Sequence, residues 1–183
     1  MRTLFFLISL LTCSKVSVGQ DSTKFRILTY GLPNFEREDA KNIIAKKWSI
    51  DFYPVAGCVV DQDLVDSAAR ENKIQEERIV TFYGKDWRDK FEKEVDNEFN
   101  IHQKVFNLID KQKFIKVKKN QLHKLGETLY YKIHSTDSDR IYEVIVDSWG
   151  KWEGKEQFIK YYKLQVDFKK KIVKILSDKV IIE

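Results

Sequence analysis

Residues 87–109 read WRDKFEKEVDNEFNIHQKVFNLI and have the strongest helical periodicity in the chain. Large apolar side chains recur in it every four residues, at Trp87, Phe91, Val95 and Phe99. The stripe continues at steps of three and four with His102, Phe106 and Ile109. An α-helix places residues three and four positions apart on one side. The spacing therefore predicts a long helix with one apolar face.

Two further helices are predicted before this one. A helix near residues 35–47 carries acidic residues in its first turn and lysines in its last, as the helix dipole favours. Asp61 is placed to cap a second helix that ends at Gly84, and Asp86 to cap the long helix. Residues 24–30 and 49–60 are β-rich and predict strands.

After about residue 112 the pattern changes to a period of two, which predicts strands. The segment with Phe114, Ile115 and Val117 opens this part, and alternating segments follow at residues 129–134, 142–146, 158–168 and 172–176. Helices followed by an antiparallel meander indicate an α+β fold, with N-terminal helices packed on a C-terminal antiparallel sheet. The arrangement would be cystatin-like or another packing of a helix on a curved sheet. We expect the Trp87–Phe99 stripe to cover one face of that sheet.

Residues 1–19 have the three parts of an export signal: a basic start, an apolar core too short to span a bilayer, and small residues before a cleavage point after Gly19. We expect a signal peptide at residues 1–19, a single α+β domain at residues 20–183, and a periplasmic or secreted protein. Leu10–Ser14 also resembles a bacterial lipobox, although Thr12 stands where a smaller residue is usual. In that alternative the chain is a lipoprotein, anchored to a membrane through Cys13.

Composition restricts the partners. The chain has 33 basic and 28 acidic residues and a net charge of +5, which falls to +3 when Arg2 and Lys15 leave with the leader. This mild excess predicts no nucleic-acid partner. Cys58 is then the remaining cysteine, which could pair with another chain. Its apolar neighbours predict a buried, inert thiol instead, and we expect a monomer.

No catalytic motif stands out. His102, His123 and His134 lack metal-ligand spacing, and no Gly-x-Ser-x-Gly turn is present. The sequence therefore predicts no catalytic residue, no metal site and no cofactor.

Two segments are candidates for ligand binding. Trp149 and Trp152 lie in a glycine-containing connection, where exposed aromatic rings bind sugars or proteins; alternatively, both rings fold back onto the sheet edge. Lys116 and Lys118 flank Val117, so a strand would present both on one face to an anionic polymer or to membrane headgroups. The alternative for the lysines is a solvated strand that resists aggregation.

Residues 82–87 read FYGKDW and residues 91–94 read FEKE. In these runs the chain resembles a group of uncharacterised exported bacterial proteins, typical of the Bacteroidota, that share a FEKKY-type domain. The resemblance covers residues 36–100, and the run Phe-Glu-Lys-Glu-Val departs from the naming motif. It implies an exported protein and no particular activity.

Together these patterns predict an exported, non-enzymatic binding or cell-envelope protein for an unknown protein or glycan ligand. The alternative is an exported enzyme, a hydrolase without a recognisable local motif. An enzyme should show a deep pocket with converging titratable groups, whereas a binding protein should show an exposed aromatic or basic patch.

Overall fold

The structure is a computed structural model that describes residues 24–182. The predicted leader and Cys13 lie outside these residues. The described chain has an α+β fold, with helices in its N-terminal part and an antiparallel sheet in its C-terminal part. None of the helices within residues 24–182 has both the length and the apolar character needed to cross a membrane.

The N-terminal part is built around a pair of parallel strands. β1 (Phe25–Tyr30) pairs with β2 (Ile50–Ala56), and α1 (Phe35–Lys47) connects them. α2 (Gln62–Tyr83) packs beside β1. Both helices were predicted with these bounds, and Pro54 lies in a strand with a single partner, as the constraint on proline requires.

The helix ends confirm two of the three capping predictions. The carboxylate of Asp61 accepts a hydrogen bond from the Leu64 amide at 2.8 Å. Gly84 ends α2 with a φ of 93°, a conformation that suits glycine. Asp86 makes no side-chain cap bond to α3 (Trp87–Asp110). Its carboxylate instead lies 2.8 Å from Lys90, which corrects the predicted cap.

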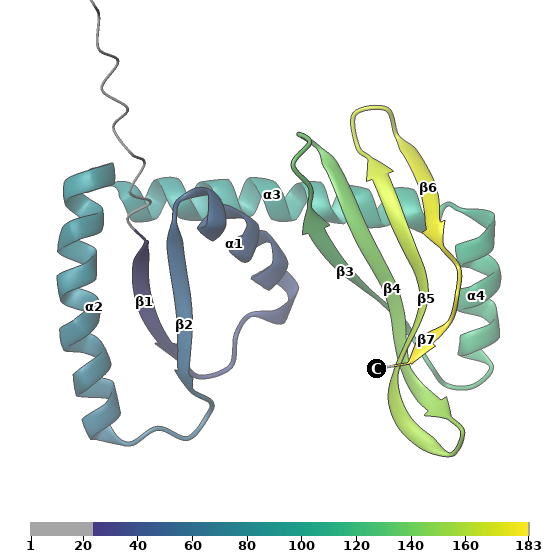
Figure 1. Cartoon of the computed structure of the whole chain (residues 1–183), viewed down its shortest axis with the longest axis horizontal. Helices are drawn as coiled ribbons and strands as arrows, with labels where there is room; N and C mark the ends of the chain where they lie inside the picture. Colours follow the sequence, from purple (N-terminus) through teal and green to yellow (C-terminus); the bar gives the residue numbers. More distant parts are fainter. Residues whose placement is uncertain (1–23, 183) are drawn as a thin grey trace, which may run out of the picture.

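The C-terminal part is an antiparallel sheet in the order β3-β4-β5-β6, with β7 pairing to β5 beyond the end of β6. The strands are β3 (Leu129–Ser135), β4 (Ile141–Trp152), β5 (Lys155–Asp167), β6 (Ile172–Ser177) and β7 (Ile181–Ile182). One face of the sheet packs on α3 and on α4 (Lys113–His123). Figure 1 shows the strands crossing the C-terminal half of α3, with their other face uncovered.

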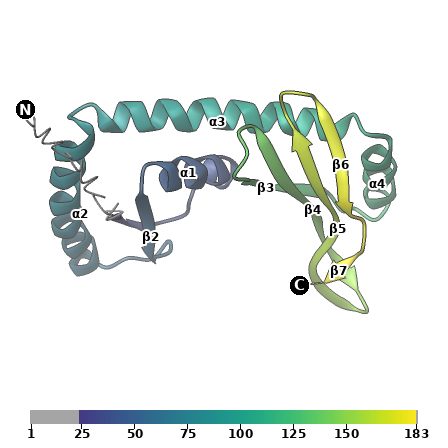
Figure 2. The same ribbon diagram turned by 45° about the horizontal axis from the view of Figure 1, so that its top comes forward.

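α3 joins the two parts, and its stripe is divided between two apolar cores. Trp87, Phe91 and Val95 belong to the N-terminal cluster, with buried residues of β1, β2, α1 and α2. Val105 and Ile109 belong to the C-terminal cluster, under the antiparallel sheet. Figures 1 and 2 both show α3 running the length of the molecule.

This division corrects the expectation that the Trp87–Phe99 stripe covers the antiparallel sheet. The first half of the stripe covers the parallel pair instead. The reason is length: 24 residues at 1.5 Å per residue make a helix of about 36 Å, which is longer than one small core.

The predicted strand around Phe114 is also wrong, because residues 113–123 form α4. Ile115 and Leu122 are buried seven residues apart, which is two turns of a helix. Lys116 and Lys118 therefore do not share a face. Lys116 is exposed, whereas the Lys118 ammonium lies 4.3 Å from the centre of the Tyr161 ring.

Cys58 was predicted to be buried, and the structure shows it exposed. β2 ends at Ala56, so the apolar run continues into a connection outside the sheet, where Val59 is 92% exposed. Apolar neighbours in sequence did not place the thiol in a core.

Candidate functional site

The uncovered face of the antiparallel sheet, called the outer face below, gathers polar and aromatic side chains. Alternate residues of a strand point to opposite faces. Val144 and Val146 point into the C-terminal cluster, so Glu143, Ile145, Asp147 and Trp149 point outward. The strand register places the following residues opposite them on the neighbouring strands: Tyr130, Lys132 and His134 on β3, and Phe158, Lys160 and Lys163 on β5.

The β4–β5 hairpin carries an aromatic pair on this face. Trp149 lies directly opposite Phe158 in the register, and their ring centres are 5.0 Å apart at 74°. The two side chains are 47% and 36% exposed. The hairpin turns through Glu153 and Gly154, which both have positive φ, and it extends beyond the neighbouring strands in Figure 1. This end of the hairpin is a narrow ribbon with a defined register.

The predicted glycine-containing connection is thus a strand rather than a loop. β4 continues through Trp152, and the turn itself is Glu153–Gly154. Trp149 and Trp152 are three positions apart, so strand alternation puts them on opposite faces of the hairpin. Trp152 is 38% exposed. The structure therefore does not bring the two tryptophans together, and Phe158 is the residue that joins Trp149.

Gly150 has a packing reason for being glycine. A Cβ at this position would meet the carboxylate of Glu127, and that carboxylate accepts a hydrogen bond from the Ser148 hydroxyl at 3.0 Å. The inner side of the hairpin is therefore fastened to the loop before β3. This leaves the opposite side, with Trp149 and Phe158, open.

A charge pair between a buried carboxylate and a partly exposed lysine lies beside the aromatic pair. Asp147 is fully buried, and its Oδ2 is 2.8 Å from the ammonium of Lys132. The same ammonium lies 4.4 Å from the centre of the Phe158 ring. Lys132 thus contacts both the carboxylate and one ring of the aromatic pair.

A groove of about 420 Å³ continues along the outer face from this point. It is lined by His134, Glu143, Ile145, Lys160, Tyr162, Lys163, Ser177, Lys179 and Ile181. The groove lies where the edge of the sheet is interrupted. β6 pairs with β5 as far as Ser177, and β7 resumes the pairing at Ile181, so the chain between them leaves the ladder.

The groove holds charged and hydrogen-bonding groups. Lys163 lies 2.7 Å from Glu143, and both side chains are partly exposed. Tyr162 also lines the groove, with its ring centre 5.1 Å from that of Phe114 on α4. Burial, and then the negative charge of Asp178, raises the pKa of its hydroxyl. Ammonium and hydroxyl donors beside one carboxylate acceptor can bind a ligand rich in hydroxyl and anionic groups.

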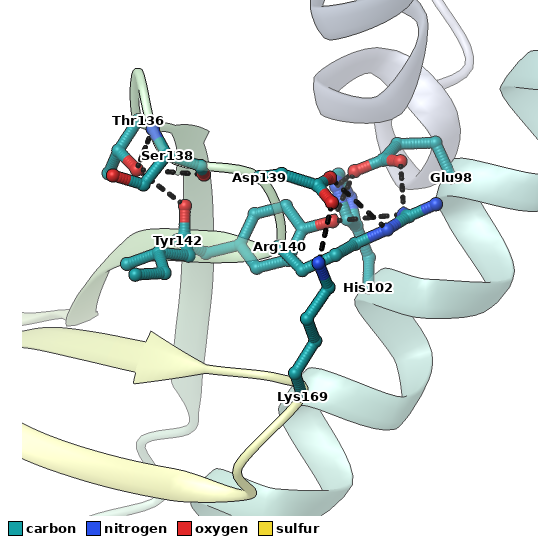
Figure 3. Close-up of polar contacts among 9 residues, drawn as sticks. Glu98, His102, Thr136, Ser138, Asp139, Arg140, Tyr142 and Lys169 are labelled. Atoms are coloured by element: carbon teal, nitrogen blue, oxygen red, sulfur yellow. Dashed lines mark hydrogen bonds and ion pairs between the residues drawn. The ribbon is translucent and has the colours of Figure 1, made fainter.

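A second polar cluster lies at the middle of α3, between the two apolar cores (Figure 3). Glu98 accepts hydrogen bonds from the Tyr142 hydroxyl at 2.7 Å and from Arg140 at 3.2 Å. His102, one turn along α3, is buried with its Nε2 3.4 Å from Glu98. The cluster belongs to the packing between α3 and β4.

The pKa of Glu98 reflects these partners. Burial by itself raises the pKa of this carboxyl. Hydrogen bonds from His102 and Tyr142, together with the positive charge of Arg140, outweigh burial and leave the pKa of Glu98 below its ordinary value. Glu98 is therefore a carboxylate at neutral pH, as a structural acceptor must be.

Of the candidates predicted from sequence, Trp149 lies at the site, Trp152 lies on the other side of the same hairpin, and Lys116 and Lys118 lie on α4. Sequence reasoning missed Phe158, Glu143 and Lys163. The signal that could have identified them is the alternation of apolar and polar residues along β4 and β5. It places these three residues on the face opposite the core residues. Their proximity depends on the register between strands, which a single strand does not reveal.

Within the described residues, no group of three or more His, Cys, Asp or Glu side chains is placed to hold a metal ion. Comparisons of the chain with protein-family models, with curated proteins and with solved structures found no match.

Proposed function

We propose that this chain is an exported, non-enzymatic binding protein that holds a glycan on the outer face of its antiparallel sheet. The observation that carries the proposal is the exposed Trp149–Phe158 pair on a hairpin of fixed register. The negative face of an aromatic ring attracts the weakly positive C–H groups on one side of a sugar ring. A preformed pair loses little conformational entropy when it binds such a ring.

The surroundings of the pair favour a glycan over a protein partner. A protein-binding hot spot is an aromatic anchor enclosed by contacts that exclude water. Here the rings are bordered by Lys132 and Asp147 and by an open polar groove. Sugars need an aromatic platform beside hydrogen-bonding groups, and this face supplies both.

Replacing Trp149 by alanine should weaken glycan binding at least about tenfold, which corresponds to about 1.4 kcal/mol. The variant should keep nearly all its stability, because an exposed cross-strand aromatic pair contributes about 0.2–1 kcal/mol. The measurement is binding of the full chain to an array of neutral and acidic polysaccharides, with thermal unfolding in parallel. Trp152→Ala is the matched control, since it removes the same side chain from the opposite face, and its binding should be unchanged. The proposal fails if wild-type protein binds no polysaccharide, or if Trp149→Ala binds as wild type does.

Export rests on the sequence of residues 1–19. We expect mass spectrometry of the mature protein to show a chain that begins at Gln20, because cleavage after Gly19 follows the small-residue pattern. A lipid-modified Cys13 at the N-terminus would establish the membrane-anchored alternative instead. An intact Met1 on protein from the native host would contradict export by this signal.

A further inference from the structure

We propose that the bound glycan is anionic, and that Lys163 and Lys179 in the groove bind its carboxylate groups while a sugar ring stacks on Trp149. This inference rests on the function proposed above and adds the chemical class of the ligand. The inference is argued from the charges of the groove, which are a separate observation from the aromatic pair.

The groove and the aromatic pair lie on the same face of β4 and β5. Lys163 lies opposite Ile145, and Phe158 lies opposite Trp149, in the register of the same two strands. Four residues of β4 separate these levels, a distance of about 13 Å along an extended strand. One sugar ring cannot reach both levels, so the surface suits at least two linked rings.

The charges of the groove favour an anion. Lys179 is exposed in the chain between β6 and β7, and within residues 24–182 no ion pair holds its ammonium. Lys163 is held by Glu143 at 2.7 Å, and the lysine side chain remains 44% exposed. A carboxylate of the ligand can approach Lys179 directly, whereas at Lys163 it competes with Glu143.

If Lys163 and Glu143 had only a structural role, substitutions at the two positions would not change binding in opposite directions. Lys163→Gln should weaken binding to polygalacturonate about two- to fivefold, the effect expected for an exposed charge contact. Lys179→Gln should weaken it similarly. Glu143→Gln should strengthen binding by a similar factor, because it frees Lys163. Binding should fall as salt rises, because exposed charges are screened.

Matched controls separate the groove from overall charge. Lys104→Gln and Asp89→Asn make the same charge changes at exposed positions of α3 and should leave binding unchanged. Dextran, a neutral glucan, is the comparison polymer. Polygalacturonate binding that is insensitive to the lysine and Glu143 changes would overturn the inference. Binding to neutral glycans alone, lost in Trp149→Ala, would also overturn it and would leave the proposed function standing.

Discussion

Replacing Phe91 by alanine should destabilise the protein by about 3–5 kcal/mol, the cost of removing a large aromatic side chain from a packed core. Phe91 is 1% exposed in the N-terminal cluster. Its ring centre lies 5.9 Å from that of Trp48 and 5.5 Å from that of Phe52. The substitution therefore removes contacts that join α3 to α1 and β2, and it leaves a cavity that these elements cannot easily close.

The measurement is equilibrium unfolding in urea, followed by tryptophan fluorescence and by far-ultraviolet circular dichroism. Phe35→Ala is the control, because Phe35 is 73% exposed and its loss should change stability by less than about 0.5 kcal/mol. Equal stability of Phe91→Ala and wild type would contradict the assignment of the first half of α3 to the N-terminal core.

The same residues show how far sequence reasoning reached. Because helical periodicity is local, the four-residue spacing of Trp87, Phe91 and Val95 was enough to predict α3. It was not enough to say what the helix covers. A partner layer is set by contacts between distant segments, and the parallel pairing of β1 with β2 leaves no mark in the spacing of α3.

Short segments were harder to assign. Residues 113–123 contain a few apolar residues among lysines, and this pattern fits a strand over four residues and a helix over eleven. The buried pair Ile115 and Leu122 decides for the helix, but burial is a property of the folded chain. The lysines that suggested a flat basic face are consequently spread around α4.

The candidate site was predictable in part. Trp149 was identified because tryptophans in a glycine-containing connection are costly to expose and often bind a ligand. The groove could not be predicted, because it lies beside two irregularities of the sheet. They are the register shift of β5 against β4 after Val146 and the interruption of pairing between Ser177 and Ile181. Both are relations between strands, so neither appears in any single segment.

The polar cluster around Glu98, between the two apolar cores, should also contribute strongly to the stability of the protein. Replacing Glu98 by alanine should destabilise the protein by about 3 kcal/mol, because the Tyr142 hydroxyl loses its acceptor and Arg140 its carboxylate. This loss is at the lower end of the range expected for breaking a buried ion pair. The reason is that Arg140 is 36% exposed, so water can partly replace its lost partner. Urea unfolding measures the loss. Glu92→Ala is the control on the same helix, because its ion pair with Arg37 is exposed and should contribute about 0–1 kcal/mol.

Acid provides an independent check on the same carboxylate. The pKa of Glu98 is lower in the folded protein than its ordinary value of 4.5, so the folded state binds this proton less readily than the unfolded state does. The stability that Glu98 contributes is therefore fully present above the ordinary value and is lost as the pH falls through the lowered one. Glu98→Gln, which cannot titrate, should show a smaller fall in melting temperature between pH 7 and pH 3 than wild type. Parallel acid profiles for the two proteins would mean that the contacts with Tyr142 and Arg140 do not stabilise the ionised form, and that apolar packing alone holds β4 against α3.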